Sequence, residues 1–208
     1  ISRVILAATQ MEVGWPPVKQ SGANDGHDSE FQIMRDLFSF AIAVYEDYPE
    51  FYNNVAGKIF SEYVPKRNFY YEDSMFHSQG DAYGQYRYCA EIYMTYLLDG
   101  MGVENLIHKN QHLMAYHFIY RHRPDGSHLS DSDNYDVPLS GDQNTEPLFF
   151  AGNFYNDPYL RQEFYRNTNW RLRNNSDVLS PVLFLALNKP EVGLKTYESL
   201  PLSMYGGD

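Results

Sequence analysis

The sequence predicts an all-α fold built from antiparallel helix pairs, an arrangement that fits a solenoid or an (α/α) toroid. Two observations predict it. Apolar residues recur every three or four positions in successive segments, as on one face of a helix, and strand-like alternation is lacking. Long polar segments join the helical ones, and long ordered loops are commonly functional. We expect the inner helix ends and these loops to line a groove.

The first two expected helices lie on either side of Pro49. The first opens at Asp28 and runs to Pro49, and the second starts at Pro49 and stops before Pro65, because a proline disfavours the helical turn that precedes it. Residues 66–79 are polar and aromatic without a clean period, so we expect a loop there.

The later expected elements are two helices, a second long loop and two further helices. A helix over about 81–98 ends at Gly100 and Gly102, since glycine is common just past a helix end. Asp157-Pro158 is typical of a cap followed by a first-turn proline and opens another helix. The remaining segments are a helix over about 106–122, a loop over 124–156 and a last apolar helix over 176–188.

Composition and charge limit the function classes. The chain has 208 residues, 43% hydrophobic and 21% charged, which is ordinary globular usage. Its 16 Lys and Arg against 27 Asp and Glu give a formal net charge of −11, so we expect neither nucleic acid nor an anionic membrane surface as a partner. The 19 tyrosines favour sugars, because a phenol ring can stack while its hydroxyl forms a hydrogen bond. The single cysteine, Cys89, is expected to be a buried thiol.

A first candidate constellation is His27-Asp28-Ser29-Glu30, which follows a turn-like stretch containing Asn24. If a helix begins near Asp28, His27 and Glu30 meet across its first turn, beside the positive end of the helix dipole. A histidine there can exchange protons near neutral pH. The alternative is that Asp28 or Ser29 is only a helix cap.

A second constellation is the string Gly80 to Tyr88, directly after His77 and Gln79. Tyr83 falls in the first turn of the expected helix, and Arg87 lies one turn later on the same face. A guanidinium near a phenol lowers the pKa of the phenol, so such a tyrosine could remove a proton at moderate pH. The alternative is a tyrosine that only packs or stacks.

Metal and cofactor motifs are weak. His108 and His112 are four residues apart and could chelate a metal from one helix face, but no carboxylate ligand is evident. Residues 125–136 resemble a calcium loop that lacks the closing glutamate. No phosphate-binding glycine loop, dinucleotide fingerprint or nucleophile elbow is present. We therefore expect no metal or cofactor in this chain.

Together the two leading constellations resemble the heparinase II/III-like family of polysaccharide lyases, most closely its heparinase II branch. That family has a His-x-Ser-Glu string and a Gln-Gly-Asp-x-Tyr-Gly string, here His27–Glu30 and Gln79–Gly84. His27 and Tyr83 are 56 residues apart, close to the family's spacing, and Arg87 matches a family arginine. The likeness spans most of residues 20–136, and the turn Arg123-Pro124-Asp125-Gly126 resembles one in the family.

The resemblance implies β-elimination at a uronic acid. By analogy, Tyr83 is base and acid for one substrate epimer, His27 assists proton transfer or neutralises the carboxylate, and Glu30 orients or shares a proton with the carboxylate. Two rivals stay open: a toroid glycoside hydrolase using paired carboxylates such as Glu30 and Asp81, and a non-catalytic glycan-binding domain. The residues expected to bind the substrate are Arg87, His77, Gln79 and Asn24.

The resemblance also sets expectations for domains and substrate. Residues 1–190 are expected to be a partial toroid catalytic domain, and 191–208 the start of a linker to a β-sandwich domain outside this chain. In the family that domain carries a further catalytic histidine and a structural zinc, and no histidine here lies beyond His128. The partners implied are that domain and an acidic, heparan sulfate-like glycan, which the charge of −11 suggests is lightly sulfated or unsulfated. The expected location is periplasmic or secreted.

Overall fold

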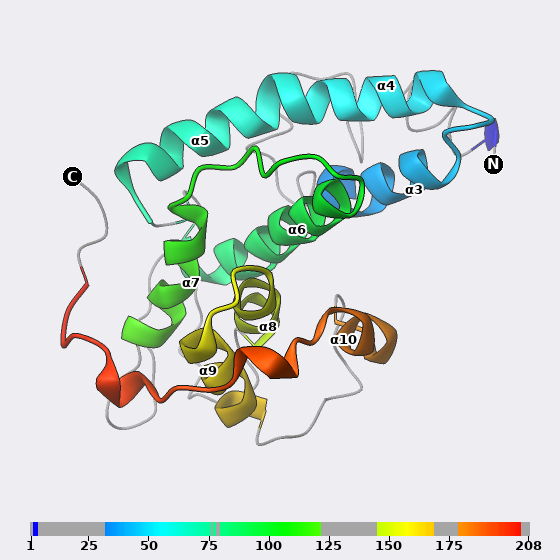
Figure 1. Ribbon diagram of the computed structural model, residues 1–208. Coiled ribbons are helices and arrows are strands. Elements are labelled where there is room, and N and C mark those ends of the chain that lie inside the picture. The colour runs from blue at the N-terminus through cyan, green and yellow to red at the C-terminus, as the bar shows by residue number, and fades with distance from the viewer. Residues whose placement is uncertain are drawn as a thin grey trace. The chain divides into compact units, whose positions relative to one another are not determined.

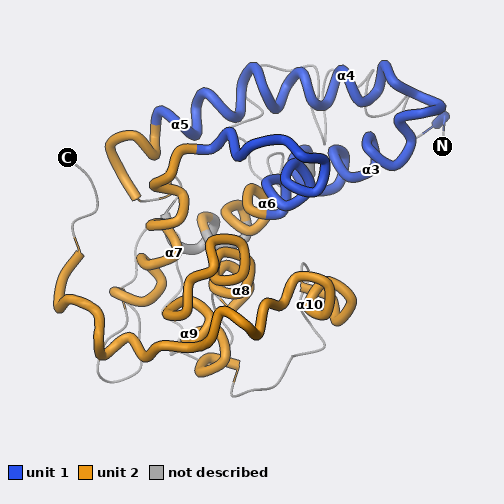
Figure 2. Tube along the Cα trace, in the orientation of Figure 1, with its two compact units in different colours: residues 1–69, 93–107 blue, residues 70–92, 108–208 orange. Residues whose placement is uncertain are grey.

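The computed structural model describes residues 2–3, 32–75, 77, 80–121, 145–168 and 179–204, and only the backbone of residues 32, 80–83 and 85–86. All regular structure in these ranges is helical, which confirms the all-α class (Figure 1). The chain divides into two compact units (Figure 2). Unit 1 comprises residues 1–69 and 93–107, and unit 2 comprises residues 70–92 and 108–208.

Unit 1 is built from helices that follow one another closely in sequence. A π-helical segment, Gln32–Leu37, leads directly into α3, Phe38–Ala43, so this helix ends before the predicted Pro49. The next helix, α4, spans Pro49–Lys58. Aromatic pairs join α3 to α4, with Phe40 edge-on to Phe51 at 5.7 Å between ring centroids. The core of this unit includes the buried apolar side chains of Met34, Phe38, Ala41, Phe51, Val55 and Ile59.

The helix that starts at Pro49 does not stop before Pro65, so the loop predicted over 66–79 is wrong for residues 66–73. A π-helical segment, Ile59–Tyr63, connects α4 to α5, Val64–Asp73. Within it the amide of Val64 donates to the carbonyl of Ile59, five residues back. Pro65 has no amide hydrogen to donate, and the π-helical turns directly before it interrupt the α-helical bonding pattern at this point.

The helix α6, Gly80–Gly100, confirms the predicted third helix and its end. Gly102 has a positive φ of 76°, a conformation that glycine adopts without strain. The amide of Val103 then donates to the carbonyl of Leu98 at 2.9 Å, and that of Gly102 to Asp99 at 2.9 Å, which satisfies two terminal carbonyls. Cys89 is fully buried, as predicted.

Unit 2 contains α7, Gln111–Tyr120, and α8, Thr145–Phe154. Helix α8 lies within the predicted loop over 124–156, so that prediction is wrong for these residues. The helix is buried on all sides, and such a segment has no polar face from which a helical period could be recognised. Helix α7 begins later than predicted, and Leu106 lies before it and is exposed.

Helix α9, Pro158–Thr168, packs against α8, as Figure 1 shows. Between the two helices Asn156 has a φ of 56°, and the amide of Asp157 donates to the carbonyl of Gly152 at 2.8 Å. A Cβ at Gly152 would lie 3.0 Å from the backbone nitrogen of Arg161, so glycine allows this close approach. The turn therefore fixes Asp157 between the end of α8 and the start of α9.

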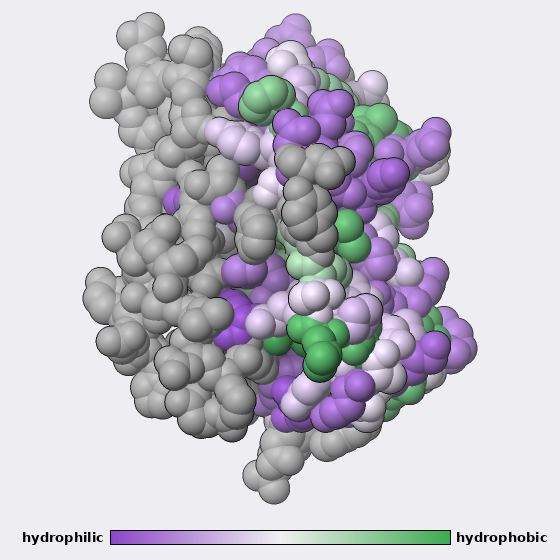
Figure 3. Space-filling model, turned by 90° about the vertical axis from the view of Figure 1, so that its left-hand side faces the viewer, coloured by the Kyte–Doolittle hydropathy of each residue, from purple (hydrophilic) through white to green (hydrophobic). Residues whose placement is uncertain are grey.

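The last helix, α10, spans Pro181–Leu187, and the hydroxyl of Ser180 caps it by accepting from the amide of Leu183 at 3.2 Å. Its residues Val182 and Leu185 are 75% and 79% exposed. On the face drawn in Figure 3 hydrophobic colours form separate patches among hydrophilic ones. Among the described residues no helix is long and apolar enough to cross a membrane.

Candidate functional site

The predicted site residues divide into three groups. His27, Glu30, Asn24 and Gln79 lie outside the described residues. Tyr83 lies in the first turns of α6, where the backbone alone is described. His77 and Arg87 are described fully, and both are buried.

His77 lies against the first turns of α6. A Cβ built at Gly84 would stand 3.0 Å from Cβ, 3.3 Å from Cγ and 3.5 Å from Nδ1 of His77. This approach is tighter than most contacts of a Cβ, so an alanine at position 84 would require His77 to shift by a few tenths of an ångström. The structure thus brings His77 beside the helical turn that carries Tyr83.

One face of α6 carries three positions with ionisable side chains, Tyr83, Arg87 and Glu91. Residues 83, 87 and 91 follow at intervals of four, which aligns them along one side of a helix. Arg87 is 2% exposed and Glu91 is 0% exposed. Two buried side chains of opposite charge therefore lie one turn apart, next to the predicted catalytic tyrosine. Glu91 belongs to neither of the sequence motifs, although it follows Arg87 by four residues.

Glu91 is held from outside its own helix. The side-chain amide of Gln111, at the start of α7, donates to Oε1 of Glu91. The Tyr155 hydroxyl, in the turn after α8, donates to Oε1 of Gln111, and the Tyr88 hydroxyl donates to the Gln111 carbonyl at 2.9 Å. Because Gln111 is fully buried, this network fixes the Glu91 carboxylate in one place.

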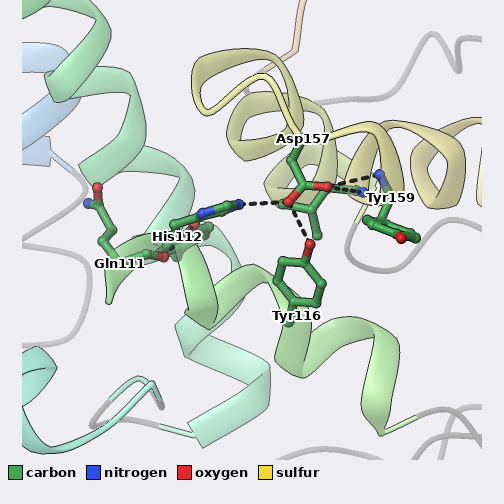
Figure 4. Close-up of polar contacts among 7 residues, drawn as sticks. Gln111, His112, Tyr116, Asp157 and Tyr159 are labelled. Carbon is green, nitrogen blue, oxygen red and sulfur yellow. Dashed lines mark hydrogen bonds and ion pairs between the residues drawn. The ribbon is translucent and has the colours of Figure 1, made fainter. Parts of the chain in front are cut away.

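A second cluster is centred on Asp157 (Figure 4). Nε2 of His112 lies 2.8 Å from Oδ2 of Asp157, and the hydroxyl of Tyr116 donates to the same oxygen at 2.6 Å. The other carboxylate oxygen caps α9 by accepting from the amides of Tyr159 at 2.8 Å and Leu160 at 3.1 Å. This confirms the predicted cap at Asp157-Pro158. His112, whose side chain is 29% exposed, also stacks on Tyr155 at 4.5 Å between centroids.

The surroundings of Asp157 determine its protonation. Burial raises the pKa of Asp157, but the hydrogen bonds from His112, Tyr116 and the Leu160 amide, with the charge of His112, outweigh burial and hold the pKa below its usual value. Burial and the neighbouring carboxylate raise the pKa of Tyr116, so its phenol stays protonated as a donor. Asp157 is thus an ionised buried group shared by α7 and α9.

The histidine pair considered as a metal site is not arranged as predicted. Because α7 begins at Gln111, His108 lies before the helix, and its Nδ1 accepts from the amide of Asn110 at 3.3 Å. His112 instead faces Asp157. Within the described ranges no group of three or more His, Cys, Asp or Glu residues could hold a metal.

The contact between His77 and Gly84 predicts different outcomes for two helical glycines. At Gly57 in α4 a Cβ would meet nothing within 4 Å, so Gly57→Ala should stabilise the protein by about 0.5–1 kcal/mol through helix propensity. Gly84→Ala should lose that gain, because His77 must move. Chemical denaturation of both variants measures the difference. Equal gains at the two positions would show that His77 does not pack there.

Known proteins add no assignment to this geometry. No protein-family model matches the chain, and no curated protein matches it significantly.

Proposed function

We propose that this chain is part of a polysaccharide lyase that cleaves a uronic-acid-containing glycan by β-elimination. The observation that carries the proposal is the first part of α6. There the Gln79–Gly84 string leads into a helix that presents positions 83 and 87 on one face, with His77 packed against Gly84. This arrangement supports the resemblance to the heparinase II/III-like lyases, which rests on the strings His27–Glu30 and Gln79–Gly84.

The chemistry requires three groups. The C5 proton of a uronate is poorly acidic, because its removal places a second negative charge beside the carboxylate. A lyase must therefore neutralise or hydrogen-bond that carboxylate, remove the C5 proton and protonate the leaving glycosidic oxygen. In the proposal Tyr83 removes and returns the proton, His27 and Glu30 act on the carboxylate, and Arg87 binds the anion or favours the phenolate of Tyr83.

The proposed architecture is part of an (α/α) toroid, with the remaining catalytic histidine and a structural zinc supplied by a β-sandwich domain after residue 208. Helix pairs such as α8 and α9, joined by a short turn, support antiparallel pairing. His77, Gln79 and Asn24 complete the proposed substrate contacts. A periplasmic or secreted location suits a protein acting on polysaccharides.

The proposed substrate is a lightly sulfated or unsulfated glycan related to heparan sulfate. A surface that binds a densely sulfated chain is rich in Lys and Arg, whereas this chain carries 16 of them against 27 Asp and Glu. We therefore expect the full-length protein to degrade an unsulfated uronate glycan faster than heparin. Parallel digestions at equal mass concentration, compared over a range of salt concentrations, measure the preference.

Product analysis separates the proposal from its rivals. β-Elimination leaves an unsaturated uronate that absorbs in the ultraviolet. A glycoside hydrolase gives new reducing ends without that absorbance, and a glycan-binding domain gives neither. We expect ultraviolet absorbance and reducing ends to rise together during digestion by the full-length protein. Reducing ends without absorbance would contradict the proposal.

A further inference from the structure

Glu91 has a buried carboxyl group that the proposed reaction does not use. It lies on α6 in the same row as positions 83 and 87, and its side chain is fully buried. Burying a carboxylate away from water is costly unless an opposite charge and hydrogen bonds compensate it. Arg87, itself buried, is the cationic group one turn away on the same face.

The fixed position of Glu91 matters as much as its charge. Gln111 cannot turn freely. The nitrogen of its side chain donates to Glu91, and the oxygen of its side chain accepts from Tyr155. Its backbone carbonyl accepts from Tyr88. A carboxylate held in this way keeps its place one helical turn from Arg87. A surface ion pair would not do so, because its side chains change rotamer and water screens the charges.

We infer that Glu91 is a positioning residue for the proposed lyase reaction. Gln111 holds the Glu91 carboxylate in place, and this carboxylate in turn holds Arg87. Glu91 thereby sets the charge along the face of α6 that carries Tyr83. The inference rests on the proposed function. Glu91 does not contact the substrate in this proposal. It changes the pKa of Tyr83 indirectly, through Arg87 and through the electric field of its buried charge.

Glu91 shares its surroundings with Tyr88. Burial raises the pKa of Tyr88, and Tyr155 after α8, Tyr71 from α5, Glu91 and Cys89 on α6 add to that increase. Of these groups around Tyr88, Glu91 is the carboxylic acid and the others are phenols or a thiol. Phenols and thiols ordinarily lose their protons above neutral pH. The histidine stacked on Tyr155, His112, has Asp157 as its own anionic partner.

The test is the pH dependence of kcat for Glu91→Gln in the full-length protein, followed by ultraviolet absorbance. Without the negative charge of Glu91, the positive charge of Arg87 is less compensated and favours the phenolate of Tyr83 more strongly. We expect the acidic limb of the profile to move to lower pH by about half to one unit. This is the effect of removing one unit charge about 12 Å away, the rise along the helix from position 83 to position 91. The matched control is Glu163→Gln, which removes another buried carboxylate, on α9, and should leave the limb in place.

A second variant covers the case in which Glu91→Gln does not fold. Glu91→Asp keeps the charge but shortens the side chain away from Gln111, so we expect kcat to fall about tenfold, with KM within twofold and the acidic limb unmoved. An unmoved limb in a folded Glu91→Gln protein, or unchanged kcat in Glu91→Asp, overturns the inference. A wild-type protein that produces no unsaturated product overturns the proposed function itself, and with it the role of Glu91.

Discussion

Replacing Tyr83 with phenylalanine in the full-length protein is expected to lower kcat for β-elimination by about 100- to 10,000-fold, the usual contribution of a positioned acid or base. Phenylalanine keeps the ring and removes only the hydroxyl that exchanges protons. Binding of the glycan should therefore remain within a few-fold of wild type. Initial rates of ultraviolet absorbance and a direct binding titration measure the two effects separately.

The matched control for that variant is Tyr93→Phe on the same helix. Position 93 does not share the row formed by positions 83, 87 and 91, so elimination should stay near the wild-type rate. Retained elimination activity in Tyr83→Phe would remove Tyr83 from the mechanism. Equal losses in the two variants would point to damage to α6 and not to lost proton transfer.

Asp157→Ala is expected to give the largest loss of stability, about 3 kcal/mol in the free energy of unfolding. About 1 kcal/mol comes from the lost cap on α9. The rest arises because His112 and Tyr116 lose the buried acceptor that both share, and unmade buried hydrogen bonds cost roughly 1–3 kcal/mol. Denaturant unfolding followed by far-ultraviolet circular dichroism measures the change.

Two controls separate the parts of this effect. Asp157→Ser can still cap α9 but cannot reach both side chains on α7, so it should recover about 1 kcal/mol of the loss. Ser180→Ala removes an exposed cap for which the described residues show no bond to another helix, and it should cost only about 0.5–1 kcal/mol. If Asp157→Ala costs no more than Ser180→Ala, the bonds from α7 do not stabilise the protein.

The same carboxylate predicts a dependence on pH. The folded-state pKa of Asp157 lies below its usual value, so the unfolded chain takes up its proton at higher pH than the folded chain does. The stability that Asp157 contributes is therefore complete above its unfolded pKa, and it is lost as pH falls through the folded value. Asp157→Asn should show less acid destabilisation than wild type between neutral pH and about pH 3. Parallel acid dependences in the two proteins would contradict this.

The helical class and several boundaries could be predicted because local signals determine them. The capping residue Asp157 and the positive φ at Gly102 belong to short motifs with a clear physical basis. The course of the chain at Pro65 and through α8 could not be predicted in this way. A π-helical segment makes the proline tolerable, and α8 is buried on every side, so neither leaves a simple periodic pattern.

The candidate site was predictable only in part, for a related reason. His77 and Arg87 follow from the strings around Tyr83, and the structure describes both as buried beside or on α6. Glu91 and Gln111 were missed because their importance depends on burial and on a bond between residues 20 positions apart. No local motif encodes such a contact.

The mass of the glycan fragments tests β-elimination most directly. Elimination consumes no water. The fragment that leaves with the glycosidic oxygen has the same mass as the corresponding hydrolysis product. The fragment that bears the unsaturated uronate is one water lighter than its hydrolysis counterpart. Mass spectrometry of an exhaustive digest by the full-length protein resolves this difference for every fragment. We predict that newly formed non-reducing ends are one water lighter throughout. Fragments with the full mass of hydrolysis products would contradict a lyase.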